Sequence, residues 1–432
     1  LADGLDKYLQ ETQYGFRRKK GTAQALHYIR RIVERGERTN NKTLFVLLDW
    51  EKAFDKVLHD KIPETLKIMN VPVKLTNATK ELYRTPTFKV EMKGAESEWI
   101  QQNTGTRQGC PSSPYLFVII MSCLFHDIHK NDELKLKEQR MEGMEHDQIL
   151  YADDTICMTQ DEEAMNRILA AIETEGATYG LKLNRTKCEY LCFGEAKAVK
   201  FKDGTPVPKK KDVKYLRCNM NDKGDPVTEV NRRIRECMAI LNKLHPFFYH
   251  TDNSVSRKLQ MFNAIIVSKL MYGLETTEIN QALKRKLDTF QLKCSRKILH
   301  IPTTYIDREF SNDYVKHQVN LKLKEEKKKP IITMSEMHKQ RRVAYLIALL
   351  NAGPNDPGTA VTFDTNTLLP IELGKLRVGQ PRVNWYRNTL KDLWITTKQK
   401  IATVKFASEF DPTNLAHVAA IKTYAKDSAK KD

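Results

Sequence analysis

The chain has 432 residues, of which 41% are hydrophobic and 29% charged. This balance excludes a disordered or collagen-like chain, and at roughly 150 residues per domain the length predicts about three domains. The longest apolar run, 115–125, is too short for the ~20 residues of a membrane span, and the first residues lack a secretion signal. We therefore expect a protein of the nucleus or cytoplasm without a membrane partner.

The net charge of +18 and the eight scattered cysteines refine this expectation. A large basic chain is a candidate for binding a polyanion, most often nucleic acid, although a solvated basic surface would explain the same charge. The cysteines have neither the density of a disulfide scaffold nor the spacing of a zinc site. They indicate reduced, mostly buried thiols.

The N-terminal third contains three clear elements. Residues 23–36 predict an amphipathic helix closed by Gly36. Residues 43–49, TLFVLLD, are typical of a strand buried on both faces that ends at Asp49. Ser113 and Pro114 predict an N-cap and a first-turn proline for an apolar helix that runs to about residue 130.

The middle of the chain predicts a hairpin, a helix and a strand. Two short strand-like runs, 149–151 and 156–158, flank the sequence ADDT, which therefore lies at a hairpin tip. Residues 161–179 predict a helix with Gly180 as its C-cap, and residues 181–193 predict a returning strand.

After about residue 200 the pattern becomes helical. Helices are predicted at 227–248, 254–273 and 281–299, and in the first of them three arginines lie off the apolar face. The lysine-rich run 322–329, followed by Pro330, divides this region from a C-terminal part.

Two acidic elements stand about one hundred residues apart, Asp49 at a strand end and Asp153-Asp154 at the hairpin tip. Adjacent carboxylates raise each other's pKa unless a cation neutralises them, and three acids together form a hard oxygen site suited to Mg²⁺. Two ions held there would support in-line phosphoryl transfer. Taken singly, each element is better explained as a turn pair or a helix cap.

The order of motifs decides between these interpretations. The segments LFVLLDWEKAFDKVL (44–58), TGTRQGCPSSP (104–114), LYADDT (150–155) and GLKLNRTK (180–187) follow one another as do the palm motifs of reverse transcriptases, which this chain resembles. QYGFRRKKGTAQAL (13–26) is similar to the fingers element of the non-LTR retrotransposon branch. LMYGLET (270–276), FQLKCSRKILHIP (290–302) and RVGQPRVNW (377–385) resemble that branch's region after the palm.

The resemblance implies a right-hand polymerase with an α/β palm. Its parts would be partial fingers (1–42), the palm (43–220), a helical thumb (221–305) and a basic, mostly helical C-terminal extension (306–432). The implied function is RNA-directed DNA polymerisation by two Mg²⁺ ions, with Mn²⁺ as a substitute. The implied partners are an RNA template, a DNA primer, deoxynucleoside triphosphates and an endonuclease domain outside this chain. The alternative is a degenerate or domesticated nucleic-acid-binding protein with little or no polymerase activity.

The resemblance also implies roles for individual residues. Asp49 and Asp153 would be the main metal ligands, with Asp154 in support, and Lys187 would neutralise the leaving pyrophosphate. Phe54 would block a ribose 2′-OH, which disfavours an RNA polymerase. The remaining nucleotide-binding candidates are Trp50, Arg107, Gln108 and Gly109. The nucleic-acid-binding candidates are Arg17, Arg18, Tyr151, Arg232, Arg233, Arg235 and Lys243.

Three departures from the family pattern stand out. Ser112 replaces a usual leucine, and Arg217 replaces the usual glycine of the turn that grips the primer. The chain also begins within the fingers, so we expect the basic run 17–20 to substitute in part for upstream residues that hold the triphosphate.

Overall fold

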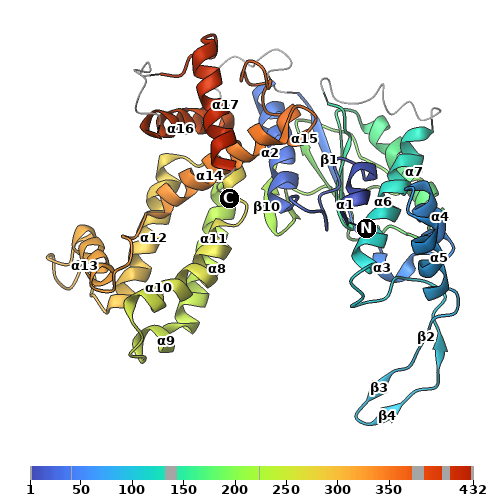
Figure 1. Ribbon diagram of the computed structural model, residues 1–432, viewed down its shortest axis with the longest axis horizontal. Helices are drawn as coiled ribbons and strands as arrows, with labels where there is room; N and C mark the ends of the chain where they lie inside the picture. The colour runs from blue at the N-terminus through green and yellow to red at the C-terminus, as the bar shows by residue number, and fades with distance from the viewer. Residues whose placement is uncertain are drawn as a thin grey trace.

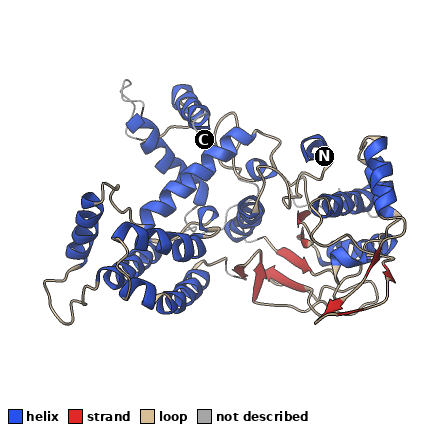
Figure 2. Ribbon diagram, turned by 60° about the horizontal axis from the view of Figure 1, so that its bottom comes forward, coloured by secondary structure: helices blue, strands red, loops and turns tan. Residues whose placement is uncertain are grey.

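The computed structural model of the chain describes residues 2–39, 41–131, 144–222, 224–371, 384–400 and 409–429. Figure 1 shows two lobes that diverge from a common junction: a mixed α/β lobe and an all-helical lobe, with the C-terminal helices lying across the junction. Figure 2 shows that the strands gather in the first lobe. No helix in the described ranges is long and apolar enough to cross a membrane.

The α/β lobe, here called the palm lobe, is built on a four-stranded antiparallel sheet in the order β6-β7-β1-β8. The strands are β1 (Thr43–Leu48), β6 (Gln148–Tyr151), β7 (Asp154–Thr159) and β8 (Glu189–Phe193). The predicted strand before Asp49 and the predicted hairpin are confirmed. The predicted strand 181–193 is shorter, because residues 182–184 bond instead to the segment that follows β1.

Helices cover both faces of this sheet, which explains why β1 is apolar throughout. Leu44, Val46 and Leu48 point into the core shared with α6 and α7, whereas Phe45 points into the core shared with α2. The helices of this lobe are α1 (Ala2–Leu5), α2 (Thr22–Thr39), α3 (Ala53–Lys56), α4 (Lys61–Ile68), α5 (Val73–Leu82), α6 (Ser113–Lys130) and α7 (Glu162–Thr178).

Three predicted helix ends need correction. Helix α2 continues past Gly36, which is buried inside it against Thr43. Ser113 is the first residue of α6 and not its N-cap, since its hydroxyl donates to the Arg107 carbonyl at 2.6 Å instead of capping the helix. Helix α7 begins one residue later than predicted, because Asp161 is its N-cap and accepts from the Ala164 amide at 2.7 Å.

A narrow ribbon projects from the palm lobe between α5 and α6 (Figure 1). It consists of two short antiparallel pairs whose residues are all exposed. The strands are β2 (Thr87–Phe88), β3 (Glu91–Met92), β4 (Ala95–Glu96) and β5 (Ile100–Gln101).

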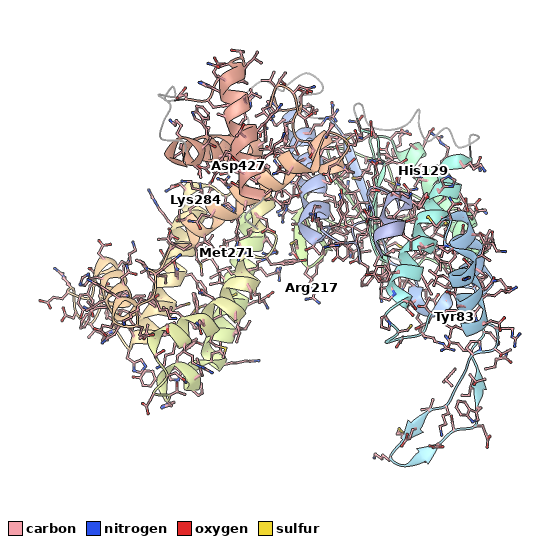
Figure 3. The ribbon with its side chains drawn as sticks, viewed as in Figure 1. Tyr83, His129, Arg217, Met271, Lys284 and Asp427 are labelled. Atoms are coloured by element: carbon pink, nitrogen blue, oxygen red, sulfur yellow. The ribbon has the colours of Figure 1, made fainter. Side chains whose placement is uncertain are left out.

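A second hairpin, β9 (Asp212–Tyr215) and β10 (Cys218–Asn221), leads from the palm lobe into the helical lobe. Its two-residue turn, Leu216-Arg217, has positive φ at both positions (45° and 64°). A hairpin turn of this kind favours glycine or asparagine. The arginine thus occupies the backbone conformation that glycine would adopt without strain, and Figure 3 shows Arg217 between the two lobes.

The helical lobe, here called the thumb lobe, confirms the three predicted helical regions. The first is α8 (Val227–Lys243) with α9 (His245–Tyr249). The second is α10 (Val255–Phe262) with α11 (Ser268–Met271), joined by a π-helical turn (Asn263–Val267). The third is α12 (Gln281–Leu299). One core cluster extends from Val230 to Met334, so helix α13 (Asn312–Glu325) packs with the thumb core across the predicted boundary at residue 305.

The C-terminal region is helical, as expected, and packs on α2. Its helices are α14 (Met334–Ala352), α15 (Pro357–Ala360), α16 (Trp385–Lys400) and α17 (Leu415–Ala429). His27 of α2 is fully buried against Tyr345 and Trp385, with ring centroids 5.0 and 4.8 Å away, and contacts the Thr362 hydroxyl at 2.8 Å. Of the predicted motif 377–385, only the last two residues fall within the described ranges.

Seven of the eight cysteines are buried, which confirms that most of these thiols lie inside the fold.

Candidate active site

The three predicted carboxylates meet at one edge of the palm sheet. Leu48 pairs with Thr155, so Asp49 and Asp154 come next along their two strands. Tyr151 pairs with Asp154 and closes a two-residue turn made of Ala152 and Asp153. The sheet register therefore brings together two acidic elements that are separated by about one hundred residues.

The electrostatics of the cluster are those of like charges held together. The pKa of Asp154 is raised to about 6, first because the surrounding protein displaces water and then because of the charges of Asp153 and Asp49. The pKa of Asp153 is raised for the same reasons, desolvation first and Asp49 next. Lys187 forms an ion pair with the cluster, its Nζ lying 3.9 Å from Asp49 Oδ1.

Both members of that pair are solvated, since the Lys187 side chain is 66% exposed and that of Asp49 is 42% exposed. An exposed pair at this distance is weak, so Lys187 does not neutralise the cluster. Among the described residues no three Asp, Glu, His or Cys side chains form a ready-made metal site. The donor set nevertheless suits a divalent cation, because its oxygens are hard ligands whose mutual repulsion a cation would relieve.

The loop 104–109 packs against the segment that follows β1. The Gly105 amide donates to the Val57 carbonyl and the Thr106 amide to the Phe54 carbonyl, both at 2.7 Å. Gly105 has φ of +91°, and a Cβ there would press on the backbone of Asp55 at 2.7 to 2.9 Å. Only glycine fits this approach, and it joins the loop to the Asp49 region.

The nucleotide-binding candidates in this loop are exposed. Gln108 donates to Asp55 Oδ1 at 3.0 Å, and Arg107 donates to the Leu82 carbonyl at 2.9 Å. Gly109 has φ of +81° with open space where a Cβ would stand. The loop thus presents backbone and polar side chains on the same side of the palm lobe as Phe54.

Phe54 itself is half-buried. Its ring stacks on that of Phe117 of α6, with centroids 4.2 Å apart and planes tilted by 25°. One part of the ring belongs to the palm core and the other part remains accessible. This arrangement fits both a wall beside a sugar and a simple core contact.

The predicted role of Trp50 in nucleotide binding needs correction, because its side chain does not face a nucleotide. Successive side chains of a strand point to opposite faces, and Trp50 therefore points away from Asp49. It is 6% exposed, its indole N–H donates to the Thr155 hydroxyl at 3.2 Å, and its ring packs on Gly176 of α7. Trp50 holds the end of β1 against α7.

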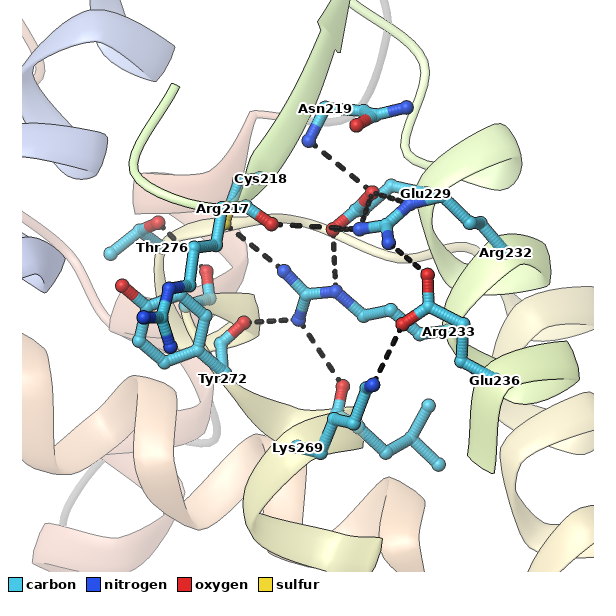
Figure 4. A network of polar contacts seen from close by, with 12 residues as sticks. Arg217, Cys218, Asn219, Glu229, Arg232, Arg233, Glu236, Lys269, Tyr272 and Thr276 are labelled. Atoms are coloured by element: carbon cyan, nitrogen blue, oxygen red, sulfur yellow. Dashed lines mark hydrogen bonds and ion pairs between the residues drawn. The ribbon is translucent and has the colours of Figure 1, made fainter. Parts of the chain in front are cut away.

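Arg233 is a second correction, since it is buried and not part of an exposed basic face. Its side chain is 3% exposed, and it pairs with Glu229 of the same helix (Figure 4). It also donates to the carbonyls of Leu270 and Tyr272 and to Cys218 Sγ. Arg233 therefore ties the palm hairpin to two thumb helices.

Two further arginines have structural partners. Arg232 lies between Glu229 and Glu236, which occupy its guanidinium. Arg17 is almost fully buried and donates to the Asp6 carboxylate and to the carbonyls of Asp6, Gln10 and Gln13. The guanidinium groups of Arg232 and Arg17 are therefore bound to other groups of the fold.

The remaining candidates lie where a nucleic acid could reach them. Arg18, Arg235 and Lys243 are exposed, and Tyr151 is half-buried beside the hairpin tip. Their predicted role in binding nucleic acid stays a prediction.

Sequence reasoning assigned no role to Gln13 and Gly15, which contact the acidic hairpin directly. The Gln13 side-chain oxygen accepts from the Ala152 amide at 3.0 Å. A Cβ on Gly15 would collide with the backbone nitrogen of Ala152. The available signal was a glutamine two residues before a glycine, which does not reveal a partner 139 residues away.

The chain is similar to several known proteins. Residues 2–220, about half of the chain, match the family model described as reverse transcriptase (RNA-dependent DNA polymerase). The chain is 27% identical over 169 residues to the retrovirus-related Pol polyprotein of type-1 retrotransposable element R2 of Nasonia vitripennis, covering 38% of this chain and 16% of that protein. It is 22% identical over 325 residues to the RNA-directed DNA polymerase from mobile element jockey of Drosophila melanogaster, covering 72% and 34%.

A third relative is the 149 kDa protein of transposon TX1 from Xenopus laevis, 26% identical over 272 residues, covering 61% of this chain and 20% of that protein. The aligned regions thus span about a sixth to a third of these relatives. Among solved structures, a Candida albicans telomerase in complex with a telomeric RNA fragment aligns with a TM-score of 0.40 and 12% identity, covering 82% and 54% of the two chains. By the family model and the order of its motifs, the chain belongs to the reverse transcriptase family.

Proposed function

We propose that this chain extends the 3′ end of a DNA primer on an RNA template. The observation that carries the proposal is the cluster of Asp49, Asp153 and Asp154, which sheet register gathers at one edge and whose mutual charge contributes to a raised pKa at Asp153 and Asp154. Like charges assembled at a strand edge cost stability, and a cation-dependent reaction explains why they are kept.

Asp49 and Asp153 would hold two Mg²⁺ ions, with Asp154 in support. When bound, the ions would supply charge to favour the primer alkoxide and the leaving pyrophosphate. The protein itself contributes by holding groups in position. The sheet fixes the carboxylates, and the 104–109 loop lies alongside them.

The reaction forms one bond to phosphorus and breaks one. The primer 3′ hydroxyl loses its proton to solvent and its oxygen bonds to the α-phosphorus of the incoming nucleotide, while the bond from that phosphorus to the bridging oxygen breaks and its electron pair leaves with pyrophosphate. Lys187 stands 3.9 Å from Asp49 on an exposed side chain, where its ammonium group would meet the charge that develops on the pyrophosphate.

Phe54 would set the choice of sugar. Phe117 stacks on its ring from the core side, so the Phe54 side chain cannot rotate into the core to make room for a 2′-OH. Gln108 and Gly109 would lie under the nucleotide and template, where open space at Gly109 permits close backbone approach.

The setting we propose is a mobile element related to non-LTR retrotransposons, in which the primer is a nicked target-DNA end. The partners are the RNA template, the DNA primer and deoxynucleoside triphosphates. An endonuclease domain outside this chain would supply the nick.

The test is primer extension on an RNA template with Mg²⁺, comparing the chain with its Phe54→Val variant. We expect extension by the unmodified chain. We expect the variant to raise ribonucleotide incorporation relative to deoxynucleotide by about ten- to a hundredfold, since steric selection is worth that much.

An unchanged ratio of ribonucleotide to deoxynucleotide incorporation would mean that Phe54 is only a core residue. If the chain bound primer–template but failed to extend it with Mg²⁺ or Mn²⁺, the binding-protein alternative would replace the polymerase.

A further inference from the structure

The hairpin that carries Asp153 is held in an unfavourable conformation. Ala152 has φ of 57°, a left-handed backbone that costs a non-glycine residue about 1 kcal/mol. Such a conformation persists only where the surroundings impose it. Its peptide directly precedes Asp153, so whatever fixes Ala152 also fixes the tip of the acidic hairpin.

The surroundings that impose it come from the N-terminal segment 12–15. This segment runs parallel to β6: the Tyr14 amide donates to the Leu150 carbonyl at 2.8 Å, and the Leu150 amide donates to the Thr12 carbonyl at 3.0 Å. It acts as a fifth strand at the edge of the palm sheet and ends beside the hairpin turn.

Gln13 makes the decisive contact. Its side chain is fully buried, and its Oε1 accepts from the Ala152 amide at 3.0 Å and from the Gly15 amide at 2.9 Å. Both partners are N–H donors, which fixes the side-chain oxygen in this place. The Nε2 of Gln13 is buried and has no hydrogen-bond partner among the residues that the structure describes. Only the acceptor half of the amide is used.

Gly15 completes the contact from the other side. The Ala152 nitrogen lies where a Cβ of residue 15 would stand. Six residues on, Gly21 has only a side-chain oxygen of Gln24 at 3.7 Å from its corresponding Cβ position. Close packing on the hairpin is therefore specific to Gly15.

We propose that Gln13 and Gly15 are positioning residues that clamp the Ala152 peptide and so set the place of Asp153 in the active site. This rests on the proposed function for the role of Asp153, whereas the clamp itself is a property of the fold. Neither residue touches the reacting atoms.

Four variants of the full chain test the clamp. Gln13→Leu removes the acceptor at similar volume, and Gln13→Glu keeps an acceptor oxygen whether it is ionised or protonated. Gly15→Ala forces the hairpin away, and Gly21→Ala is its matched control. A misplacement of about 1 Å costs about a hundredfold in rate, so we expect kcat for Gln13→Leu and Gly15→Ala to fall ten- to a hundredfold.

We expect the KM for deoxynucleotide and the affinity for primer–template, measured by fluorescence anisotropy, to change less than threefold. Gln13→Glu should recover at least part of the loss in kcat, and Gly21→Ala should match the unmodified chain. Hydrogen exchange across residues 148–156 should accelerate in Gln13→Leu, a readout that does not depend on activity.

The proposal is overturned if kcat in both damaging variants stays within twofold of Gly21→Ala, or if exchange at 148–156 is unchanged. It is also overturned if kcat, primer affinity and thermal stability fall together in proportion, because that pattern indicates general unfolding. An Asp153→Asn variant run alongside separates the two claims: if it stays active, the proposed site fails, whatever the exchange data show about the clamp.

Discussion

Two clusters of charged side chains in this molecule have opposite designs. At the strand edge of the palm lobe, Asp49, Asp153 and Asp154 bring like charges together, and burial and repulsion raise the pKa of Asp153 and Asp154. At the junction with the thumb lobe, Arg233 and Glu229 bring opposite charges together in a buried network (Figure 4). The difference fits the catalytic role that we propose for the first cluster and a structural role for the second.

The contrast between the two clusters would be lost if the chain did not need Asp153 for primer extension. Asp153→Asn should lower the extension rate about a thousandfold, since loss of one metal ligand removes ~4 kcal/mol of transition-state stabilisation. Thermal stability should be equal or slightly higher, because one of three like charges is gone. Retention of a tenth of the activity in single-turnover assays would contradict the assignment.

The junction should show the reverse pattern. Arg233→Met removes one of the two arginines that pair with buried Glu229 and the donors to the Leu270 and Tyr272 carbonyls, and we expect a loss of about 3 kcal/mol in the free energy of unfolding. Arg235→Met, two residues along the same helix and exposed, is the control and should change stability by less than about 0.5 kcal/mol. Equal effects in urea denaturation would mean that the buried pair has no special structural role.

Arg217 sharpens the comparison, because it lies next to the junction and its backbone is strained. Arg217→Gly should stabilise the chain by about 1 kcal/mol, since glycine adopts φ of 64° without strain. Thermal unfolding measures this. A loss of stability would show that the arginine side chain makes contacts that outweigh its backbone cost.

The smallest expected effect is on pH dependence. The pKa of Asp154 is raised to about 6 in the folded chain, so the fold binds a proton more tightly than the unfolded state does. Its favourable contribution is present at about pH 4 and is lost as pH rises through about 6. In chelator-treated buffer, the difference in unfolding free energy between Asp154→Asn and the unmodified chain should therefore shift in favour of the variant as pH rises over this range.

Solvent screening keeps this gain below about 1 kcal/mol. Added Mg²⁺ should reduce the difference, and parallel pH curves for the two chains would contradict the raised pKa.

Local patterns placed the carboxylates at strand ends, and the order of the motifs along the chain then made these carboxylates a predicted site. An apolar run that ends in Asp49, and two strand-like runs around Asp153, each define a strand and its end within ten residues. The same locality explains the successful helices of the thumb. Trp50 was the avoidable error, because the period of two in a strand already places it opposite Asp49.

The misassigned arginines show what a sequence does not display, namely which charge meets which. Glu229 and Arg233 have helical i, i+4 spacing, a signal that predicts pairing when it is considered. Arg17 contacts Asp6, 11 residues earlier in the chain, and Gln13 contacts Ala152, 139 residues later. Such contacts depend on the folded chain, so no local pattern reveals them.

The packing of the C-terminal helices on α2 has a consequence for synthesis. Helix α2 ends at Thr39, and α14, which helps to cover His27, begins at Met334. At 5–20 residues per second, a ribosome needs roughly 15 to 60 s to make the intervening chain. During that time the apolar face of α2 is not yet covered by the C-terminal helices. We expect chaperones that act on the nascent chain to bind this face.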